Sequence, residues 1–466
     1  MRIVFNTFGT LGDLHPMLAL ATELRRRGHD CVFAVPEVFR LVLDPLNFRV
    51  YPLPPNLDPH DAARAADLMD LRRGTERLLR EVLFPVLPET VRRLRAAVED
   101  EGGADLLISS DLAYAAPIVA ELTGIRWASV ALAPLSFFSR YDPPALLHFP
   151  GLAWIEQRVP AVNRAVMPIA RWYARNWPQP VYELRTSLGL PRGPSPLFDA
   201  KNSPQLVLAL FSSLLSAPQQ DWPAHTRICG FPLYDGRQPG GPQASELPAG
   251  RLAEADSRSA GALDVSANSA IPSSTLPPHV EKFLEMGEPP VVFTLGSSAV
   301  FAAGDFYAIS KQAAAKLGVR AILLTGVLPD GQPRGILSPD LCTAEYVSYA
   351  ELFPRVAAIV HQGGIGTIAH ALKNGKPMII MPCSHDQPDN ARRCVRLGIS
   401  RTVPREKYTA ERAAAELHAL LRDPFTAPRY ATATQLAARR VEKENGTQTA
   451  CDALESLLEK EAPIRK

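Results

Sequence analysis

The sequence predicts an α/β fold with two domains, each built around a parallel sheet. Three observations support this prediction. The chain has 466 residues, which is more than one ordinary domain holds. Short apolar runs alternate with helix-like segments, first over residues 1–235 and again from residue 279. Between them, residues 236–278 are dominated by Gly, Pro, Ser and Ala, a composition typical of a flexible linker.

The first half reads as repeated strand–loop–helix units. The run 2–7 predicts a strand, residues 9–13 a Gly-rich loop, and Pro16 to Arg27 a helix that stops at Gly28. Because the predicted strands are apolar on both faces, we expect a parallel sheet covered on both sides. Residues 135–200, rich in Pro and aromatic residues, are interpreted as an insertion that shapes an apolar pocket. Further strands are predicted at 31–35, 48–53, 105–110, 127–132 and 206–215, and helices at 37–46, 62–100 and 114–123.

The second half repeats the pattern. A second strand–helix series is predicted to start at 290–297. Strands are predicted at 320–325, 357–361 and 377–382, and helices at 305–317, 365–374, 388–397 and across 409–462. We therefore expect an N-terminal domain at 1–235, a linker or insertion at 236–278, a C-terminal domain at 279–440, and a helix at 441–466 as a candidate to pack back on the N-terminal domain. Two such domains place a ligand cleft at the carboxyl ends of both sheets.

Composition excludes several classes of protein. Lys and Arg total 50 and Asp and Glu 48, and this net charge of +2 argues against a general nucleic-acid binder. No apolar run is long enough for a transmembrane helix and no signal peptide is evident, so we expect a cytoplasmic protein. The six cysteines are scattered without a C-x-x-C pair, which predicts reduced thiols. Without a D-x-D or H-E-x-x-H motif, we expect no metal.

The loop after the first predicted strand carries the first candidate site, Gly9-Thr-Leu-Gly-Asp13-Leu-His15-Pro16. A carboxylate at Asp13 faces the expected cleft and can take a proton from an acceptor hydroxyl if the site raises its pKa. The alternative is that Asp13 and His15 only cap a helix N-terminus.

Two Gly-rich turns supply candidate anion sites. Val360-His361-Gln362-Gly-Gly364-Ile-Gly366-Thr367 lies between a strand and a helix, and its spacing is neither G-x-G-x-x-G nor a P-loop. Backbone N–H groups at such a turn suit a diphosphate. Thr294-Leu-Gly296-Ser297-Ser is a second turn of this kind.

A third constellation, Pro382-Cys-Ser-His-Asp386-Gln387-Pro-Asp-Asn390, follows the next strand. A neighbouring acid and amide can bridge adjacent hydroxyls of a sugar, and the alternative is an ordinary turn with a helix cap.

Together these stretches resemble the nucleotide-sugar-dependent glycosyltransferases of family 1, which have the GT-B fold of two Rossmann-like domains facing a cleft. The residues that carry the resemblance are Gly12-Asp13 with Pro16, the stretch Tyr346 to His361, the Gly-Gly-Ile-Gly-Thr turn, and Asp386-Gln387. A closer resemblance, to rhamnosyltransferases of rhamnolipid synthesis and bacterial flavonoid rhamnosyltransferases, rests on residues 217–223, 230–236, 304–307, 360–366 and 385–390.

The resemblance implies transfer with inversion at the anomeric carbon and without a metal or other cofactor. It implies that Asp13 is the general base and that the donor is bound by Gly12, Gly296, Ser297, Tyr346, Val347, His361, Gln362, Gly364, Gly366, Thr367, Asp386 and Gln387. Plant members carry a supporting Asp near Asp111, which here has no imidazole to orient, so we expect no catalytic role for Asp111.

The resemblance favours dTDP-L-rhamnose as donor and a small hydrophobic acceptor, such as a hydroxyacyl lipid or a polyphenol. The alternatives are a UDP-glucose-dependent glucosyltransferase acting on a sterol-like alcohol or natural product, a nucleotide-sugar epimerase, and a non-catalytic nucleotide-sugar binder. Phe137-Phe138 and Arg171-Trp-Tyr173 are candidates for peripheral contact with the inner membrane, the alternative being a pocket rim. Oligomeric state is not predicted.

Overall fold

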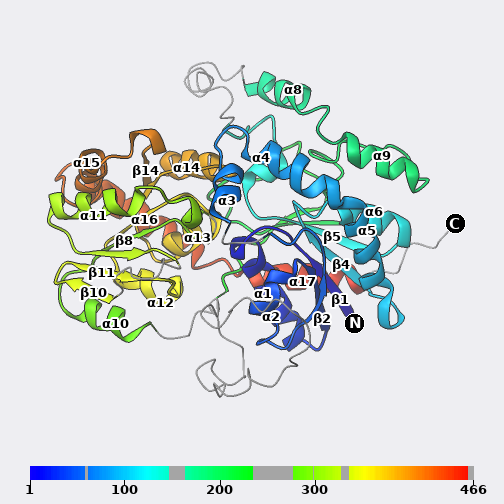
Figure 1. Ribbon diagram of the computed structural model, residues 1–466, viewed down its shortest axis with the longest axis horizontal. Helices are drawn as coiled ribbons and strands as arrows, with labels where there is room; N and C mark the ends of the chain where they lie inside the picture. The colour runs from blue at the N-terminus through cyan, green and yellow to red at the C-terminus, as the bar shows by residue number, and fades with distance from the viewer. Residues whose placement is uncertain (58–60, 146–162, 235–275, 298, 327–334, 460–466) are drawn as a thin grey trace.

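The computed structural model describes residues 1–57, 61–145, 163–234, 276–297, 299–326 and 335–459. These residues form two lobes side by side, each with a central sheet and helices against its faces (Figure 1). The expected linker 236–278 lies almost wholly outside the described residues. No helix in the described ranges is long and apolar enough to cross a bilayer.

The N-terminal lobe contains a seven-stranded sheet with the order β3-β2-β1-β4-β5-β6-β7. Every neighbouring pair is parallel, so all its carboxyl ends meet at one edge. The strands are β1 (Arg2–Asn6), β2 (Asp30–Val35), β3 (Arg49–Pro52), β4 (Leu106–Ser110), β5 (Arg126–Ala131), β6 (Leu206–Ala209) and β7 (Thr226–Ile228).

Helices cover both faces of this sheet because its strands are apolar throughout. The helices of this lobe are α1 (Leu11–Arg26), η1 (Glu37–Phe39), α2 (Arg40–Leu43), α3 (Ala62–Leu68), α4 (Gly74–Arg77), η2 (Leu78–Leu83), α5 (Phe84–Glu99), η3 (Asp100–Gly102), α6 (Ala115–Thr123), η4 (Pro134–Phe137), α8 (Asn163–Tyr173) and α9 (Gln179–Ser187).

The C-terminal lobe contains a second seven-stranded sheet with the order β10-β11-β9-β8-β12-β13-β14. All pairs are parallel except the β10–β11 hairpin at one edge. The strands are β8 (Val291–Thr294), β9 (Ala321–Leu324), β10 (Gly335–Ser338), β11 (Leu341–Ala344), β12 (Ala358–His361), β13 (Met378–Ile380) and β14 (Ser400–Thr402).

The helices of this second half of the chain are α10 (Pro278–Glu285), η7 (Ala299–Ala302), α11 (Phe306–Leu317), α12 (Tyr349–Leu352), η8 (Phe353–Arg355), α13 (Ile365–Lys373), α14 (Gln387–Arg396), η9 (Arg405–Lys407), α15 (Ala410–Leu421), α16 (Ala427–Val441) and α17 (Gly446–Glu459). The last of these leaves its own lobe. Cys451, Leu454 and Leu458 of α17 are buried in the core of the N-terminal lobe, where α17 lies against α1 (Figure 1).

Several predicted elements needed correction. The predicted strand 206–215 ends at Ala209, and β7, the β10–β11 hairpin and β14 were not predicted. The predicted helix 62–100 is divided into α3, α4, the π-helical turn η2 and α5, and Pro85 occupies the first turn of α5, where its missing N–H is tolerated.

A polar network on α14 joins the two lobes. Arg393, 1% exposed at its side chain, binds Asp389 on its own helix through Nε (2.7 Å) and Asp142 of the N-terminal lobe through its guanidinium. Asp142 also accepts hydrogen bonds from Ser216 Oγ (2.7 Å) and from Arg396 (3.1 Å). Asp389 in turn accepts from the backbone N–H of Ala145 (3.0 Å). Helix α14, which belongs to the C-terminal lobe, is therefore bound directly to the N-terminal lobe through Asp142 and Ala145.

Candidate active site

One large cavity, of about 560 Å³, lies between the two lobes. Loops after β1, β4 and β5 line it from the N-terminal lobe, and loops after β8, β12 and β13 line it from the C-terminal lobe. This is the position expected for a ligand site at the carboxyl ends of two parallel sheets.

Asp13 lies in the first turn of α1, not in the loop that the sequence predicts, because α1 begins at Leu11. Thr10 is the N-cap, and its side chain accepts from Gly12 N (3.2 Å) while Asp13 Oδ2 accepts from Thr10 N (2.8 Å). Asp13 therefore caps the helix and lines the cavity at once. Gly9, at φ +130°, is required here, since a Cβ at that position would lie 2.2 Å from Asp13 Oδ2.

The electrostatic environment suits Asp13 to proton transfer near neutrality. Burial raises the pKa of Asp13 to about 7, against the opposing effect of the hydrogen bonds from Thr10, and the charges of Asp386 and Asp111 act in the same direction as burial. Burial lowers the pKa of the neighbouring His15 to about 4, so His15 is neutral at pH 7.

The N-terminus of α13 faces the same cavity. Its N-cap residue, Gly364, offers no side chain to the free N–H groups of the first turn, and Gly364, Gly366 and Thr367 all line the cavity. Unpaired N–H groups at a helix N-terminus favour an anion. Gly296 and Ser297 line the cavity beside this turn. A Cβ on Gly296, at φ +66°, would lie 2.4 Å from Gln362 Nε2.

His361 and Gln362 separate at the end of β12. Gln362 lines the cavity, and its buried Oε1 has no hydrogen-bond partner among the described residues. His361 is fully buried, accepts from Gly363 N at Nδ1 (3.0 Å) and contacts Met378 Sδ at Nε2 (3.3 Å). The imidazole of His361 does not line the cavity, because side chains alternate across a strand and one of the two neighbours must point into the core.

The predicted nucleoside-binding loop divides in the same way. Tyr346 is 38% exposed, lines the cavity and stacks against Tyr349 at 6.3 Å between ring centres. Val347 is buried in the core and does not line the cavity.

Asp386 and Gln387 also differ in their roles. Burial raises the pKa of Asp386 to about 6, and the opposing hydrogen bond from Asn390 Nδ2 is 2.7 Å long. The same amide group donates to Gly363 O (3.0 Å), so Asn390 ties Asp386 to the Gly-rich turn. Gln387 lines the cavity, but its Oε1 accepts from Cys383 N (2.9 Å) and Ser384 N (3.1 Å) and so caps the turn.

The N-terminal side of the cavity is largely apolar. The segment 135–200 contributes as the sequence predicts, although 146–162 lies outside the described residues. Phe137, a candidate for membrane contact, instead stacks on Trp222 at 4.2 Å in the core, while Trp172 is 64% exposed. The apolar lining includes Leu57, Leu68, Leu71, Leu78, Leu79, Leu135, Phe138, Ala170, Tyr173, Trp177, Leu197 and Phe198.

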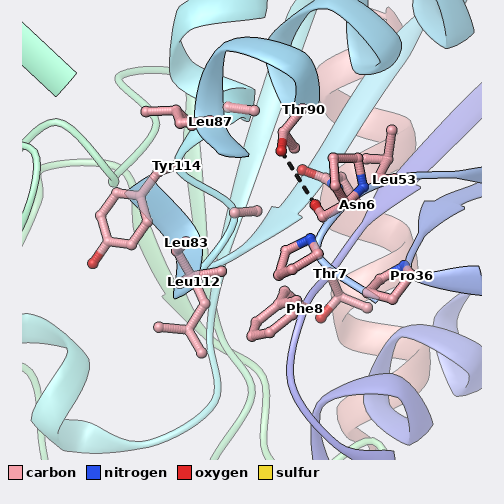
Figure 2. A pocket seen from close by; sticks show the side chains of 14 residues that line it. Asn6, Thr7, Phe8, Pro36, Leu53, Leu83, Leu87, Thr90, Leu112 and Tyr114 are labelled. Carbon is pink, nitrogen blue, oxygen red and sulfur yellow. Dashed lines mark hydrogen bonds between the residues drawn. The ribbon is translucent and has the colours of Figure 1, made fainter. Parts of the chain in front are cut away.

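A side pocket of about 30 Å³ adjoins the large cavity and shares Phe8, Leu112 and Tyr114 with it. Figure 2 shows it under α5, where Thr90 Oγ1 donates to Pro54 O (3.2 Å). Its volume suits one or two water molecules.

Comparison with known proteins is consistent with this geometry. Residues 328–454 match the family described as "Erythromycin biosynthesis protein CIII-like, C-terminal domain". The O-mycaminosyltylonolide 6-deoxyallosyltransferase of Streptomyces fradiae is 29% identical over 471 residues, covering 98% of each chain. The chain is a glycosyltransferase of the GT-B type.

Two solved structures share the fold of this glycosyltransferase. The spinosyn forosaminyltransferase SpnP superposes with a TM-score of 0.65 at 17% identity, over 99% of this chain and 100% of the other. The spinosyn rhamnosyltransferase SpnG, complexed with thymidine diphosphate, superposes with a TM-score of 0.59 at 17% identity, over 98% and 100%.

Several cavity residues of the glycosyltransferase were not among the sequence-predicted site residues: Arg72, Thr75, Lys201, His370 and His385. Arg72 and Thr75 reach the cavity from the segment around α3 and α4, and Thr75 Oγ1 lies 3.1 Å from His385 Nδ1 across the lobes. No local signal distinguishes Lys201, because an isolated Lys in a Pro-rich segment resembles any surface lysine.

Within the described ranges, no cluster of three His, Cys, Asp or Glu side chains is arranged to hold a metal ion.

Proposed function

We propose that this glycosyltransferase moves a deoxyhexose, with L-rhamnose as the first candidate, from its thymidine diphosphate ester to a hydroxyl of a largely apolar natural product. The proposal includes inversion at the anomeric carbon, with Asp13 as general base and no metal. The observation that carries it is the cavity itself, in which Asp13 of one lobe faces the anion site and Asp386 of the other.

The mechanism follows from these groups. The acceptor hydroxyl attacks the anomeric carbon from the face opposite the diphosphate, while Asp13 removes its proton. The bond between that carbon and the diphosphate oxygen breaks, and the N–H groups at the start of α13 stabilise the developing charge. A carboxylate with a pKa near 7 is partly ionised at neutral pH and is basic enough to accept the proton of the hydroxyl. Asp386 and Gln387 bind the hydroxyls of the sugar.

The donor class is supported by the names of the proteins compared above. One transfers a 6-deoxyallosyl group, one a forosaminyl group and one a rhamnosyl group, the last in complex with thymidine diphosphate. The apolar lining of the N-terminal side supports an apolar acceptor.

Asp13→Asn separates catalysis from helix capping. The Asn carbonyl still accepts from Thr10 N, so the fold and dTDP binding are expected to persist while transfer falls by about 10²–10⁴-fold. Asp13→Ala, which also removes the cap, is expected to lose about a further 1 kcal/mol of stability. Full turnover by Asp13→Asn would refute the base assignment.

Donor class is tested by thermal unfolding with dTDP-L-rhamnose, UDP-glucose, UDP-GlcNAc and GDP-mannose. A nucleotide sugar at 100 times its Kd stabilises the fold by about 2.7 kcal/mol. A response to UDP-glucose alone would replace the proposed donor.

A further inference from the structure

An ion pair in the cavity wall, between a buried lysine and a partly buried aspartate, has no part in the mechanism proposed above. Lys201 lies just before β6, and its side chain is only 7% exposed. Its Nζ donates to Asp111 Oδ1 (3.1 Å) and lies 5.1 Å from the ring centre of Phe138. Asp111 follows β4 and also accepts a hydrogen bond from Ser136 Oγ. Both members of the pair line the cavity.

The sheet order brings this pair beside the proposed base. Strands β1 and β4 are neighbours, so the turn that holds Asp13 and the turn that holds Asp111 lie at the same edge. The charge of Asp111 is felt at both Asp13 and Asp386 and, after burial, contributes to the raised pKa of each.

Few cations offset these three carboxylates. Burial lowers the pKa of His15 and His385 to about 4 and of His370 to about 3, so these imidazoles are neutral at pH 7. Arg72 is the other full cation of the described lining, and it is exposed to solvent. The titratable and charged groups of the described lining are Asp13, His15, Arg72, Asp111, Tyr114, Tyr173, Lys201, Tyr234, Tyr346, Tyr349, His370, His385 and Asp386.

We propose that Lys201 is a positioning residue of the transfer reaction, which neutralises Asp111 and thereby allows Asp13 to be ionised at the pH at which the enzyme works. Lys201 touches neither reacting atom and acts through Asp111. This inference rests on the proposed role of Asp13. An unpaired Asp111 would face Asp13 with an uncompensated negative charge and favour its protonated, inactive form.

The test is the acid limb of the kcat/KM–pH profile, measured between pH 5 and 9 on the full chain with dTDP-L-rhamnose, or with the donor that the thermal panel selects. Lys201→Met is expected to move this limb upward by about 0.5–1 pH unit, so that activity lost at pH 6.5 returns at pH 8.5. Asp111→Asn is expected to move it downward, and the double variant to return it close to the wild-type position. Lys201→Arg keeps the charge and should leave the limb in place.

A matched ion pair provides the control. Arg171 and Asp199 form a bidentate pair (2.7 and 2.8 Å) in the same segment, and neither lines the cavity. Arg171→Met should therefore leave the pH profile unchanged. Should Lys201→Met fail to fold, Asp111→Asn alone still tests the proposal, because a downward shift is required.

Two results would overturn the inference. One is an unchanged acid limb in Lys201→Met or Asp111→Asn, which would mean that the ion pair supports the fold but does not affect the ionisation of Asp13. The other is a double variant whose limb is displaced as far as that of Lys201→Met. The proposed function fails separately, through full turnover of Asp13→Asn, so the two failures are distinguishable.

Discussion

Asp142→Ala should uncouple the two lobes. In the native protein Asp142 accepts from Arg393, from Arg396 (3.1 Å) and from Ser216 Oγ (2.7 Å), and its side chain is 13% exposed. Truncation removes all three hydrogen bonds. It leaves Arg393, which is 1% exposed, with Asp389 as its one carboxylate partner.

The expected cost lies below that of a fully broken buried pair. Such a break costs about 3–5 kcal/mol, but here Arg393 keeps Asp389 and Leu215 O (3.1 Å). One charge-assisted hydrogen bond is worth about 1.5–3 kcal/mol. We therefore expect a loss of about 2–4 kcal/mol, which lowers the Tm of a domain of this size by about 5–15 °C.

Differential scanning calorimetry, combined with donor KM, distinguishes interdomain coupling from simple destabilisation. Because α14 carries Asp386 and Gln387 at its start, donor KM should rise in Asp142→Ala while Asp142→Asn, which keeps an acceptor oxygen, shows a smaller change. Glu89→Ala, which removes an exposed pair with Arg92 and Arg93 on α5, is the control and should leave both readouts unchanged. A Tm for Asp142→Ala equal to that of the wild type would refute the reasoning.

Three further predictions concern single positions. Gly296→Ala should weaken dTDP binding about tenfold, because the added Cβ, at φ +66°, would meet the side chain of Gln362. The control is Gly318→Ala, at φ +64° with nothing within 4 Å, which should lower stability alone. Equal dTDP affinities of the two variants by calorimetric titration would contradict this prediction. Burial lowers the pKa of His361 to about 3, so between about pH 6.5 and pH 3 the unfolded state binds a proton that the folded state does not. As the pH drops, this group should lower the free energy of unfolding by about 1.4 kcal/mol per pH unit. Urea titrations at pH 7, 6 and 5 should show that the free energy of unfolding depends less steeply on pH in His361→Gln than in the wild type. Leu454→Ala should destabilise the N-terminal lobe by about 2–5 kcal/mol, since this α17 residue is fully buried in the core of that lobe. The control is Leu436→Ala, which should be tolerated because Leu436 is 62% exposed. A shift of the unfolding transition of the C-terminal lobe instead would contradict the packing of α17 on the N-terminal lobe.

Most of the α/β framework could be predicted because its signals are local. Apolar runs such as Ile3-Val-Phe5, punctuated by Gly and Pro, predict parallel strands, and β1, β4, β9 and β12 lie within a residue or two of the expected positions. The short strands β7, β10, β11 and β14 were missed, since segments of three or four residues carry too little pattern. The start of α1 was misplaced by five residues because the capping box formed by Thr10 and Asp13 starts the helix at Leu11, ahead of the helix-start preference of Pro16.

The candidate site, like the fold, was predictable only where its signals are local. Gly-rich turns after strands, and Asp13 and Asp386 beside them, are visible in the sequence because parallel strands bring their carboxyl ends to one edge. Whether a residue beside such a turn faces the cavity is decided by packing, which buries His361 and Val347 in the core and places Gln362 and Tyr346 in the cavity lining. The pairing of Lys201 with Asp111, and of Arg393 with Asp142, joins residues 90 and 251 positions apart. No periodicity in the chain encodes contacts of that range. They form only once the fold has buried the cation of each pair, because a buried charge needs a nearby counterion.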